Sequence, residues 1–290
     1  VTSSGDVALE INEADKSALS DEIKAIVGDR PVYDFNMMIG DKQISSFGDG
    51  KVTLSIPYTL AAGETPEAIV VYYIDDAGRL NQVQGAYDAT SGSVVFTTNH
   101  FSSYAVGYNP VQFKDVKESD WHYKGITFIA ARDITKGISE DLFAPNANIT
   151  RGQFVVMMMR AYGIEAEANA ANNFADAGDT YYTGYLAAAK KLGIADGTGE
   201  NLFAPDNNIS RQDMFTMLYR ALDVMGTVPE ETKSADLSHY TDGASVKTYA
   251  QDAFKALLSA DIISGNGDCL LPDHTATRAE MAKVLYELLS

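Results

Sequence analysis

Two kinds of hydrophobic pattern divide the chain near residue 109. Before that point, short apolar runs alternate with polar positions, which is typical of half-buried β-strands. After it, apolar residues gather in longer stretches with helical spacing. The sequence therefore predicts strands in the first part and helices in the second. The strand-like runs are Val52, Leu54 and Ile56, then residues 69–74, 94–96 and 104–106, with turn signals at Asp49-Gly50, 75–78 and 90–92.

The first part is predicted to be an antiparallel β-sandwich. Its strands are short, and turn signals separate them at the intervals expected for two packed sheets. A helical stretch from about Asp15 to Val27 is expected to pack on the sandwich or to cross one end. No residue pattern here indicates an activity, so we expect a spacer or adhesion-type module over residues 1–109.

The second part contains a unit that occurs three times. Residues 142–161 read LFAPNANITRGQFVVMMMRA, and residues 202–221 read LFAPDNNISRQDMFTMLYRA, so that ten residues return sixty positions later. A more diverged third copy, LLPDHTATRAEMAKVLYELL, keeps the leucine, the proline and the Thr-Arg pair. A fixed period of this length indicates a repeat architecture.

Each copy is predicted to have the same anatomy. A short helix comes first, and in the first copy it spans roughly Ser119 to Asp133 with Trp121 among its apolar members. A turn that contains glycine follows, then an extended loop with a proline, then a longer helix. The glycines are Gly137, Gly197 and Gly265, and the prolines are Pro145, Pro205 and Pro272.

The longer helix begins with a pattern that helix capping explains in part. In each copy a hydroxyl residue is followed three positions later by Gln, Asp or Glu, which matches or approaches a capping box. The arginine between them is not explained by capping, because a cation at the first helical position opposes the helix dipole by about 0.3–1 kcal/mol. The residues are Thr150, Arg151 and Gln153; Ser210, Arg211 and Asp213; and Thr277, Arg278 and Glu280.

Two readings account for the arginine. A guanidinium beside the free amides of a helix start is well suited to a carboxylate or phosphate, which indicates an anion-binding site. Alternatively, each arginine forms a structural ion pair with an Asp or Glu of a neighbouring repeat. Both readings can hold in different copies.

The spacing of these motifs resembles one family. Phe113-x-Asp115-Val116, Trp121, Gly137, Phe143-x-Pro145 and Ile149-Thr150-Arg151 before a long helix resemble the S-layer homology repeat of bacterial cell-surface proteins. The resemblance covers about residues 111–290. It implies three repeats folded into one pseudo-threefold, all-α unit, with long helices in a central bundle and grooves between neighbouring repeats.

The resemblance also implies a function. Family members anchor secreted proteins to the cell wall without a covalent bond, by binding secondary cell-wall polysaccharide in these grooves. The polysaccharide often carries a pyruvate ketal, whose carboxylate contacts the motif arginine. We therefore expect an anionic polysaccharide as partner and an extracellular location at the bacterial surface. The segment from Gly50 to Tyr108 looks, more loosely, like a module that often precedes such repeats.

The expected fold is therefore multidomain, with a mainly-β sandwich followed by the all-α repeat unit. The repeats are assigned to residues 110–170, 171–228 and 229–290. The expected ligand-binding residues are Arg151, Arg211 and Arg278 with their neighbours Thr150, Ser210, Thr277, Gln153, Asp213 and Glu280, together with Trp121 and Tyr181. The two aromatic residues could stack on a sugar or serve as core or hinge residues. Only the third copy has the complete Thr-Arg-Ala-Glu motif, so Arg278 is expected to be the most conventional contact.

Composition narrows the possible partners. The formal net charge of −18 argues against nucleic acid and against binding to an anionic membrane by charge. An acidic protein that recognises an acidic glycan must therefore do so with locally placed cations. The sequence predicts no membrane insertion and shows no signal-like start. Because the family that the repeats resemble is secreted, Val1 is expected to be an internal cut with the natural N-terminus upstream.

Catalysis is not expected in this chain. Its four histidines lack the spacing of a metal site, and no nucleophile elbow, phosphate loop or dinucleotide fingerprint is present in the sequence. We predict no cofactor, no metal and no catalytic residue, and any catalytic domain is expected upstream. The alternative to glycan anchoring is a structural surface-layer protein whose modules mainly self-assemble.

Overall fold

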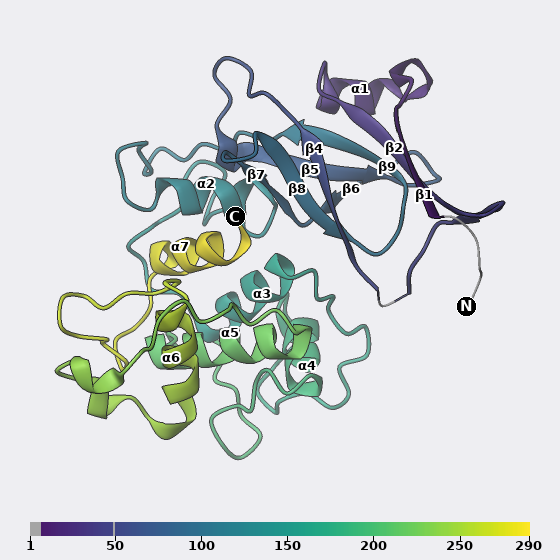
Figure 1. Cartoon of the computed structure of the whole chain (residues 1–290). Coiled ribbons are helices and arrows are strands. Elements are labelled where there is room, and N and C mark those ends of the chain that lie inside the picture. The colour runs from purple at the N-terminus through teal and green to yellow at the C-terminus, as the bar shows by residue number, and fades with distance from the viewer. Residues whose placement is uncertain (1–6, 49) are drawn as a thin grey trace. The chain divides into compact units, whose positions relative to one another are not determined.

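The computed structural model describes residues 7–48 and 50–290, which form two compact units (Figure 1). The first unit comprises the chain up to Gln112 together with Ala130–Asp133 and Leu289–Ser290. The second comprises Phe113–Ile129 and Ile134–Leu288. Each unit is described separately.

Two antiparallel sheets build the first unit. The larger has the order β1-β2-β9-β5-β6 with β3 paired to β2, and the smaller has the order β4-β8-β7. The strands are β1 (Val7–Glu13), β2 (Val32–Ile39), β3 (Lys42–Ile44), β4 (Val52–Pro57), β5 (Ile69–Ile74), β6 (Leu80–Val83), β7 (Gly85–Asp88), β8 (Ser93–Thr98) and β9 (Ser103–Tyr108). The apolar runs of the sequence therefore lie in β4, β5, β8 and β9. Asp49 of the expected Asp49-Gly50 turn lies outside the described residues.

One core joins the two sheets. Leu54 and Ile56 alternate with exposed residues along β4, so that one face of the smaller sheet is apolar. These side chains belong to the same buried cluster as Phe35 of β2, Val71 of β5 and residues of β8 and β9. Burial of each such side chain contributes about 1.5–3 kcal/mol. The shared core therefore holds the sheets together.

The predicted helix from Asp15 to Val27 is two shorter elements. A 3₁₀ turn, η1 (Lys16–Ala18), precedes helix α1 (Asp21–Val27), and a second 3₁₀ turn, η2 (Pro66–Ala68), leads into β5. The break occurs because Ser20 starts a new helix: its side-chain oxygen accepts a hydrogen bond from Ile23 N at 3.3 Å. Ile23 and Val27 then pack against Val32 and Ala105 of the sheet.

Short and long helices alternate in the repeat region. They are α2 (Tyr123–Ala131), α3 (Arg151–Ala161), α4 (Thr183–Lys191), α5 (Arg211–Met225), α6 (Gln251–Ser259) and α7 (Arg278–Leu289) (Figure 1). The 3₁₀ turns η3 (Leu237–His239), η4 (Gly243–Ser245) and η5 (Thr248–Ala250) precede α6. Trp121 was predicted to lie within the first short helix, but it precedes α2, which begins at Tyr123.

The predicted glycine turns follow the short helices, six residues after α2 ends at Ala131 and after α4 ends at Lys191. Gly137 and Gly197 have φ values of +79° and +82°, which favour glycine. A Cβ atom at Gly137 would also lie only 2.5 Å from Leu142 O, so the turn requires a residue without a side chain. The turn is closed by hydrogen bonds from Ile138 N and Ser139 N to Leu142 O, at 2.8 and 3.3 Å.

Extended segments connect the three repeats in a ring. Ile149 N donates to Ala276 O at 3.0 Å, Ala276 N donates to Ile209 O at 2.9 Å, and Ile209 N donates to Ile149 O at 3.0 Å. All three side chains are fully buried. Three isolated β-bridges flank the ring: Asn148 with Thr277, Thr150 with Asn208, and Ser210 with Thr275. Each repeat is thus hydrogen-bonded to both of the others.

The predicted fold class is wrong. The chain has mixed helix and sheet content, the repeat region is not all-α, and the chain is not clearly divided into independent domains. One reason is that the loop before each long helix satisfies its backbone groups by pairing with extended segments of other repeats. Another is Arg132, which lies in the repeat region by sequence but groups with the first unit, where it donates to Glu67 O, Ile69 O and Gly85 O.

Candidate functional site

The three predicted helix starts have the predicted caps. Thr150 Oγ1 accepts from Gln153 N at 3.3 Å, and Gln153 Oε1 accepts from Thr150 N at 3.2 Å, which completes a capping box. Thr277 and Glu280 form the same pair of bonds, at 3.2 and 2.8 Å. Ser210 Oγ accepts from Asp213 N at 3.2 Å. Local capping therefore fixes the first turn of α3, α5 and α7.

The first two amides of each long helix are already occupied. They donate to backbone carbonyls in the loop of the following repeat. Here the second repeat follows the first, the third follows the second, and the first follows the third. The donor–acceptor pairs are Arg151 to Asn207 and Gly152 to Pro205, Arg211 to His274 and Gln212 to Pro272, and Arg278 to Ala147 and Ala279 to Pro145, all at 2.8–3.0 Å. The third amide donates to the capping side chain. An anion at one of these helix starts would therefore find the guanidinium but no free amide.

Each arginine side chain lies against the loop of the following repeat. Arg151 Nε donates to Phe203 O at 2.8 Å, and its guanidinium lies 4.7 Å from the centre of the Phe203 ring. Arg278 repeats this arrangement on Phe143, at 2.8 and 4.5 Å. Arg211 Nε donates to Leu270 O at 3.2 Å. Its guanidinium stacks on Phe215 of its own helix at 5.1 Å, since the third repeat has leucine where the other two have phenylalanine.

An aspartate holds each of these loops in place. Asp115 accepts from the amides of Phe143 and Ala144 at 2.9 and 2.7 Å, and Asp176 and Asp242 do the same in the second and third repeats. Burial would raise the pKa of the Asp242 carboxyl, but its two amide hydrogen bonds outweigh burial and lower that pKa. Sequence reasoning missed Asp176 and Asp242, although both stand at the Phe/Tyr-x-Asp spacing of Asp115.

Two of the three arginines are neutralised by the following repeat. Arg151 Nη1 lies 2.6 Å from Asp213 Oδ2, and Arg211 Nη1 lies 2.8 Å from Glu280 Oε1. The carboxylate comes each time from the third residue of the next long helix. Structural ion pairing with a neighbouring repeat is therefore confirmed for these two copies.

Arg278 differs from both. The third helical residue of the repeat that follows it is Gln153, which is neutral. Among the described residues no carboxylate pairs with Arg278, and its Nη2 is buried without a hydrogen-bond partner. Burial lowers the pKa of this guanidinium, while Asp115 and Tyr181 act to raise it.

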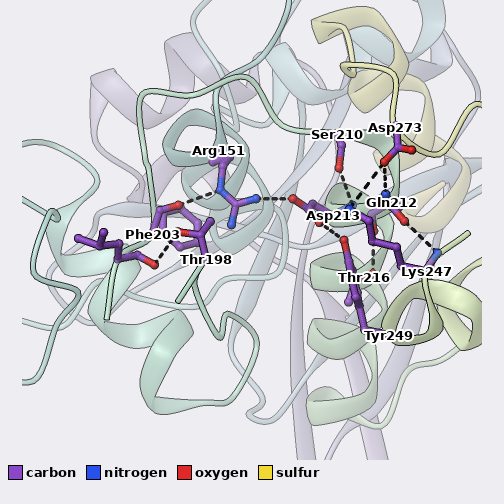
Figure 2. A network of polar contacts seen from close by, with 11 residues as sticks. Arg151, Thr198, Phe203, Ser210, Gln212, Asp213, Thr216, Lys247, Tyr249 and Asp273 are labelled. Carbon is purple, nitrogen blue, oxygen red and sulfur yellow. Dashed lines mark hydrogen bonds and ion pairs between the residues drawn. The ribbon is translucent and has the colours of Figure 1, made fainter. Parts of the chain in front are cut away.

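Two hollows lie between repeats. The first, of about 470 Å³, is lined by residues of all three repeats, including Arg151, Asp213, Arg220, Lys247 and Tyr249. Figure 2 shows how Asp213 joins them: it pairs with Arg151 on one side and accepts from the Tyr249 hydroxyl, at 2.6 Å, on the other. Burial and the Asp213 carboxylate raise the pKa of Tyr249.

The second hollow, of about 460 Å³, surrounds the other ion pair. Its lining includes Trp121 of the first repeat, Arg211 and Phe215 of the second, and Glu280 and Lys283 of the third. Of these, Phe215 and Lys283 were not predicted as site residues. They line the hollow only because the three repeats pack together, which the sequence of one repeat does not show.

The aromatic residue before each short helix is exposed. Trp121 and Tyr181 are 61% and 60% exposed, and Tyr249, at the corresponding place in the third repeat, is 47% exposed. Trp121 and Tyr249 each line one of the two hollows. Such exposed rings are not core residues.

Comparison with known proteins identifies the repeats. The family model for the S-layer homology domain matches residues 112–155, 173–215 and 239–282. The chain carries three tandem S-layer homology domains. Among the described residues, no helix is long and apolar enough to cross a membrane, and no group of three or more His, Cys, Asp or Glu side chains could hold a metal ion.

Proteins similar to this chain include enzymes and surface-layer proteins. An amylopullulanase of Thermoanaerobacterium thermosulfurigenes is 31% identical over 248 residues, which is 83% of this chain and 13% of that protein. An endoglucanase of Bacillus sp. strain KSM-635 is 33% identical over 62% of the chain and 19% of its own length. The S-layer protein sap of Bacillus anthracis is 29% identical over 60% of the chain and 20% of its own length.

The chain thus spans only 13–20% of these relatives. The amylopullulanase match covers more residues than the repeat region holds, so it extends into the first unit. Together the S-layer homology domains and their relatives support anchoring at the cell surface and place the protein outside the cell, in association with the wall.

Proposed function

We propose that the three S-layer homology domains anchor the protein by binding secondary cell-wall polysaccharide in the hollows between repeats. The observation that supports this most directly is the composition of the two hollows. Each combines an exposed aromatic ring and a lysine with arginine–carboxylate pairing: Arg151–Asp213 and Arg220–Asp196 in the first hollow, and Arg211–Glu280 in the second. Aromatic faces provide apolar contact, and the polar groups can hydrogen-bond hydroxyls.

The size of the hollows suits a short piece of glycan. Volumes of about 470 and 460 Å³ fall in the lower part of the range for small-molecule sites, about 300–1,000 Å³. The contacts are proposed to come from Trp121 and Arg211 in one hollow and from Arg151 and Tyr249 in the other. The ligand is proposed to be anionic, with a pyruvate ketal as the expected acidic group.

The remaining parts of the chain are assigned roles on the same basis. The repeat boundaries at residues 110–170, 171–228 and 229–290 and a spacer role for residues 1–109 are proposals. We also propose that this chain itself is not catalytic and that any enzyme activity of the whole protein belongs to another part of it. The small share of the amylopullulanase and endoglucanase that the chain spans supports this assignment.

A sedimentation assay with purified cell walls tests the proposal. The variant Trp121→Ala/Tyr249→Ala removes the exposed ring from both hollows, and we expect the wall-bound fraction to fall severalfold. Val224→Ala is the matched control, because Val224 is 48% exposed on α5 and lines neither hollow. Wall binding of the double variant at the control's level would contradict the proposal.

A second candidate is a structural protein whose modules assemble with one another. The similarity to the S-layer protein sap favours it. Light scattering of the purified chain without wall material separates the two functions. Concentration-dependent assembly that is unchanged by added wall polysaccharide would favour self-assembly over anchoring.

A further inference from the structure

The outermost strand of the larger sheet has an unpaired edge. β1 pairs with β2 over its whole length, and among the described residues no other strand pairs with it (Figure 1). Ala14 N donates to Val32 O at 2.9 Å in the same register, so the even-numbered residues of β1 are those that bond β2. The backbone N–H and C=O groups of Leu9, Ile11 and Glu13 therefore face away from β2.

The side chains at this edge are apolar on one face of the sheet. Leu9 is 47% and Ile11 51% exposed, although the residues opposite them, Met37 and Phe35, belong to or pack against the core between the sheets. Residues directly opposite each other in an antiparallel pair lie on the same face. Leu9 and Ile11 therefore extend the apolar face of the sandwich beyond the part that is covered.

The same edge is acidic. β1 and β2 read VALEINE and VYDFNMMI, with Glu10, Glu13 and Asp34 and with no lysine or arginine. Every residue of β1 from Ala8 onward is exposed, and Glu10 lies on the face opposite to Leu9. Residues 1–109 hold 6 basic and 15 acidic side chains, a net charge of −9. A strand that adds to this edge is therefore favoured when it is basic.

The other strands at sheet edges are protected. β3 has only three residues and begins with Lys42, and β4 has polar side chains at its exposed positions and ends at Pro57. β6 and β7 have four residues each, and the Gly85 carbonyl of β7 accepts two bonds from Arg132, at 2.8 and 3.2 Å. Short strands, lysine, proline and covering groups all oppose pairing at an edge. β1 has seven residues and none of these protections.

We propose that β1 is a docking edge for an extended segment of a partner protein in which apolar and basic residues alternate. The segment would add a strand to the larger sheet by bonding the outward backbone groups of Leu9, Ile11 and Glu13. Its apolar residues would lie opposite Leu9 and Ile11, and its basic residues would lie on the face of Glu10.

Charge complementarity favours this partner over a second copy of the chain. Pairing of β1 with itself would bring two acidic edges together, each on a chain of net charge −18. The inference goes beyond glycan anchoring, because it gives the unit that precedes the repeats a binding role of its own.

Fluorescence anisotropy with labelled peptides and the full chain tests the inference. The probe is a short peptide in which lysine and valine alternate. One control peptide has glutamate in place of lysine. The other carries N-methyl groups on its valine amides, which removes the donors that would face β1 and keeps the charge. We expect the lysine peptide to bind about tenfold or more tighter than either control peptide.

Ile11→Pro closes the edge and leaves the sheet intact. The Ile11 N–H faces away from β2, so proline removes an outward donor and keeps the bonds between β1 and β2. We expect it to weaken binding of the lysine peptide by about tenfold or more. Ile11→Val is the matched control, since it keeps the N–H and a branched apolar side chain, and it should bind as the wild type does.

Glu10→Lys tests the charge at the exposed face. It should weaken binding of the lysine peptide and strengthen binding of the glutamate peptide. Thermal unfolding of each variant checks that the fold is retained. If Ile11→Pro does not fold, the N-methylated peptide tests the same hydrogen bonds on the unaltered chain.

Amide hydrogen exchange measured by NMR locates the bound peptide. The amides of Leu9 and Ile11 should exchange about tenfold or more slowly once the lysine peptide is bound. The amides of Glu10 and Asn12 already bond β2 and should change little.

Three results would overturn the inference. They are equal binding of the lysine peptide by the wild type and a folded Ile11→Pro, equal binding of the N-methylated peptide, and unchanged exchange at Leu9 and Ile11. Self-association without peptide that Ile11→Pro abolishes, measured by sedimentation velocity, would assign the edge to a second copy and overturn the basic partner. Wall binding of Ile11→Pro should equal that of the wild type, so failure of the docking inference leaves the anchoring function standing.

Discussion

Removal of the Asp213 carboxylate should destabilise the repeat region much more than removal of the Gln153 amide. Asp213→Ala leaves Arg151, which is 6% exposed, without its counter-charge, and it also removes the acceptor of the Tyr249 hydroxyl. The charge-assisted bond contributes about 1.5–3 kcal/mol, and the tyrosine bond about 0.5–1 kcal/mol because the half-exposed hydroxyl can return to water. The two effects share one carboxylate, so we expect a total of about 2–4 kcal/mol.

Gln153→Ala is the matched control at the same position of the first repeat. It removes one capping bond, from the Thr150 amide at 3.2 Å, and should cost about 0.5–1 kcal/mol. Urea unfolding followed by circular dichroism at the helix band measures both variants. A double-mutant cycle of Arg151→Ala with Asp213→Ala should then show coupling of at least about 1 kcal/mol. Equal destabilisation by Asp213→Ala and Gln153→Ala would refute the reasoning.

Three further changes have defined outcomes. Asp176→Ala removes the acceptor of two loop amides and should destabilise the chain by about 2 kcal/mol in urea unfolding. Asp141 is partly exposed, so the control Asp141→Ala should change stability by less than about 0.5 kcal/mol. Gly152→Gln should destabilise strongly in a thermal melt, because a Cβ there would lie 2.9 Å from Tyr182 Cδ1 and 3.1 Å from the backbone oxygen of Pro205. Burial and the Glu64 carboxylate raise the pKa of Tyr58 to about 12, so absorbance at high pH should show that this tyrosine ionises late. The stability that this shift contributes is present below the tyrosine's usual pKa of 10 and should be lost as the pH rises toward 12. Tyr58→Phe should not show this loss.

Local patterns in the sequence predicted elements better than architecture. Alternation along Val52, Leu54 and Ile56 identified β4, and the hydroxyl before each arginine identified the starts of α3, α5 and α7. The helix expected from Asp15 to Val27 was divided by a serine that caps a new start. The all-α class was wrong because pairing of extended segments from different repeats leaves no periodic signal in either segment.

In the candidate site, too, the sequence predicted the local features but not the contacts between repeats. The arginines could be found because they oppose the helix dipole and capping does not explain them. Their partners could not be assigned, since Asp213 lies 62 positions from Arg151 and Glu280 lies 69 positions from Arg211. Several residues could neutralise a given arginine in a chain this acidic, and only the order of the repeats around the ring selects one.

In the complete Thr-Arg-Ala-Glu motif, the glutamate at the third position of the long helix has two roles. Glu280 uses one oxygen to cap its own helix, at 2.8 Å from the Thr277 amide, and the other to neutralise Arg211, also at 2.8 Å. Asp213 is one methylene shorter; it neutralises Arg151, and no bond back to the Ser210 amide is found within the described chain. Gln153 keeps the cap and has no charge to offer. Asp213 in the second repeat and Gln153 in the first therefore separate two functions, capping and neutralisation, that Glu280 combines in one side chain.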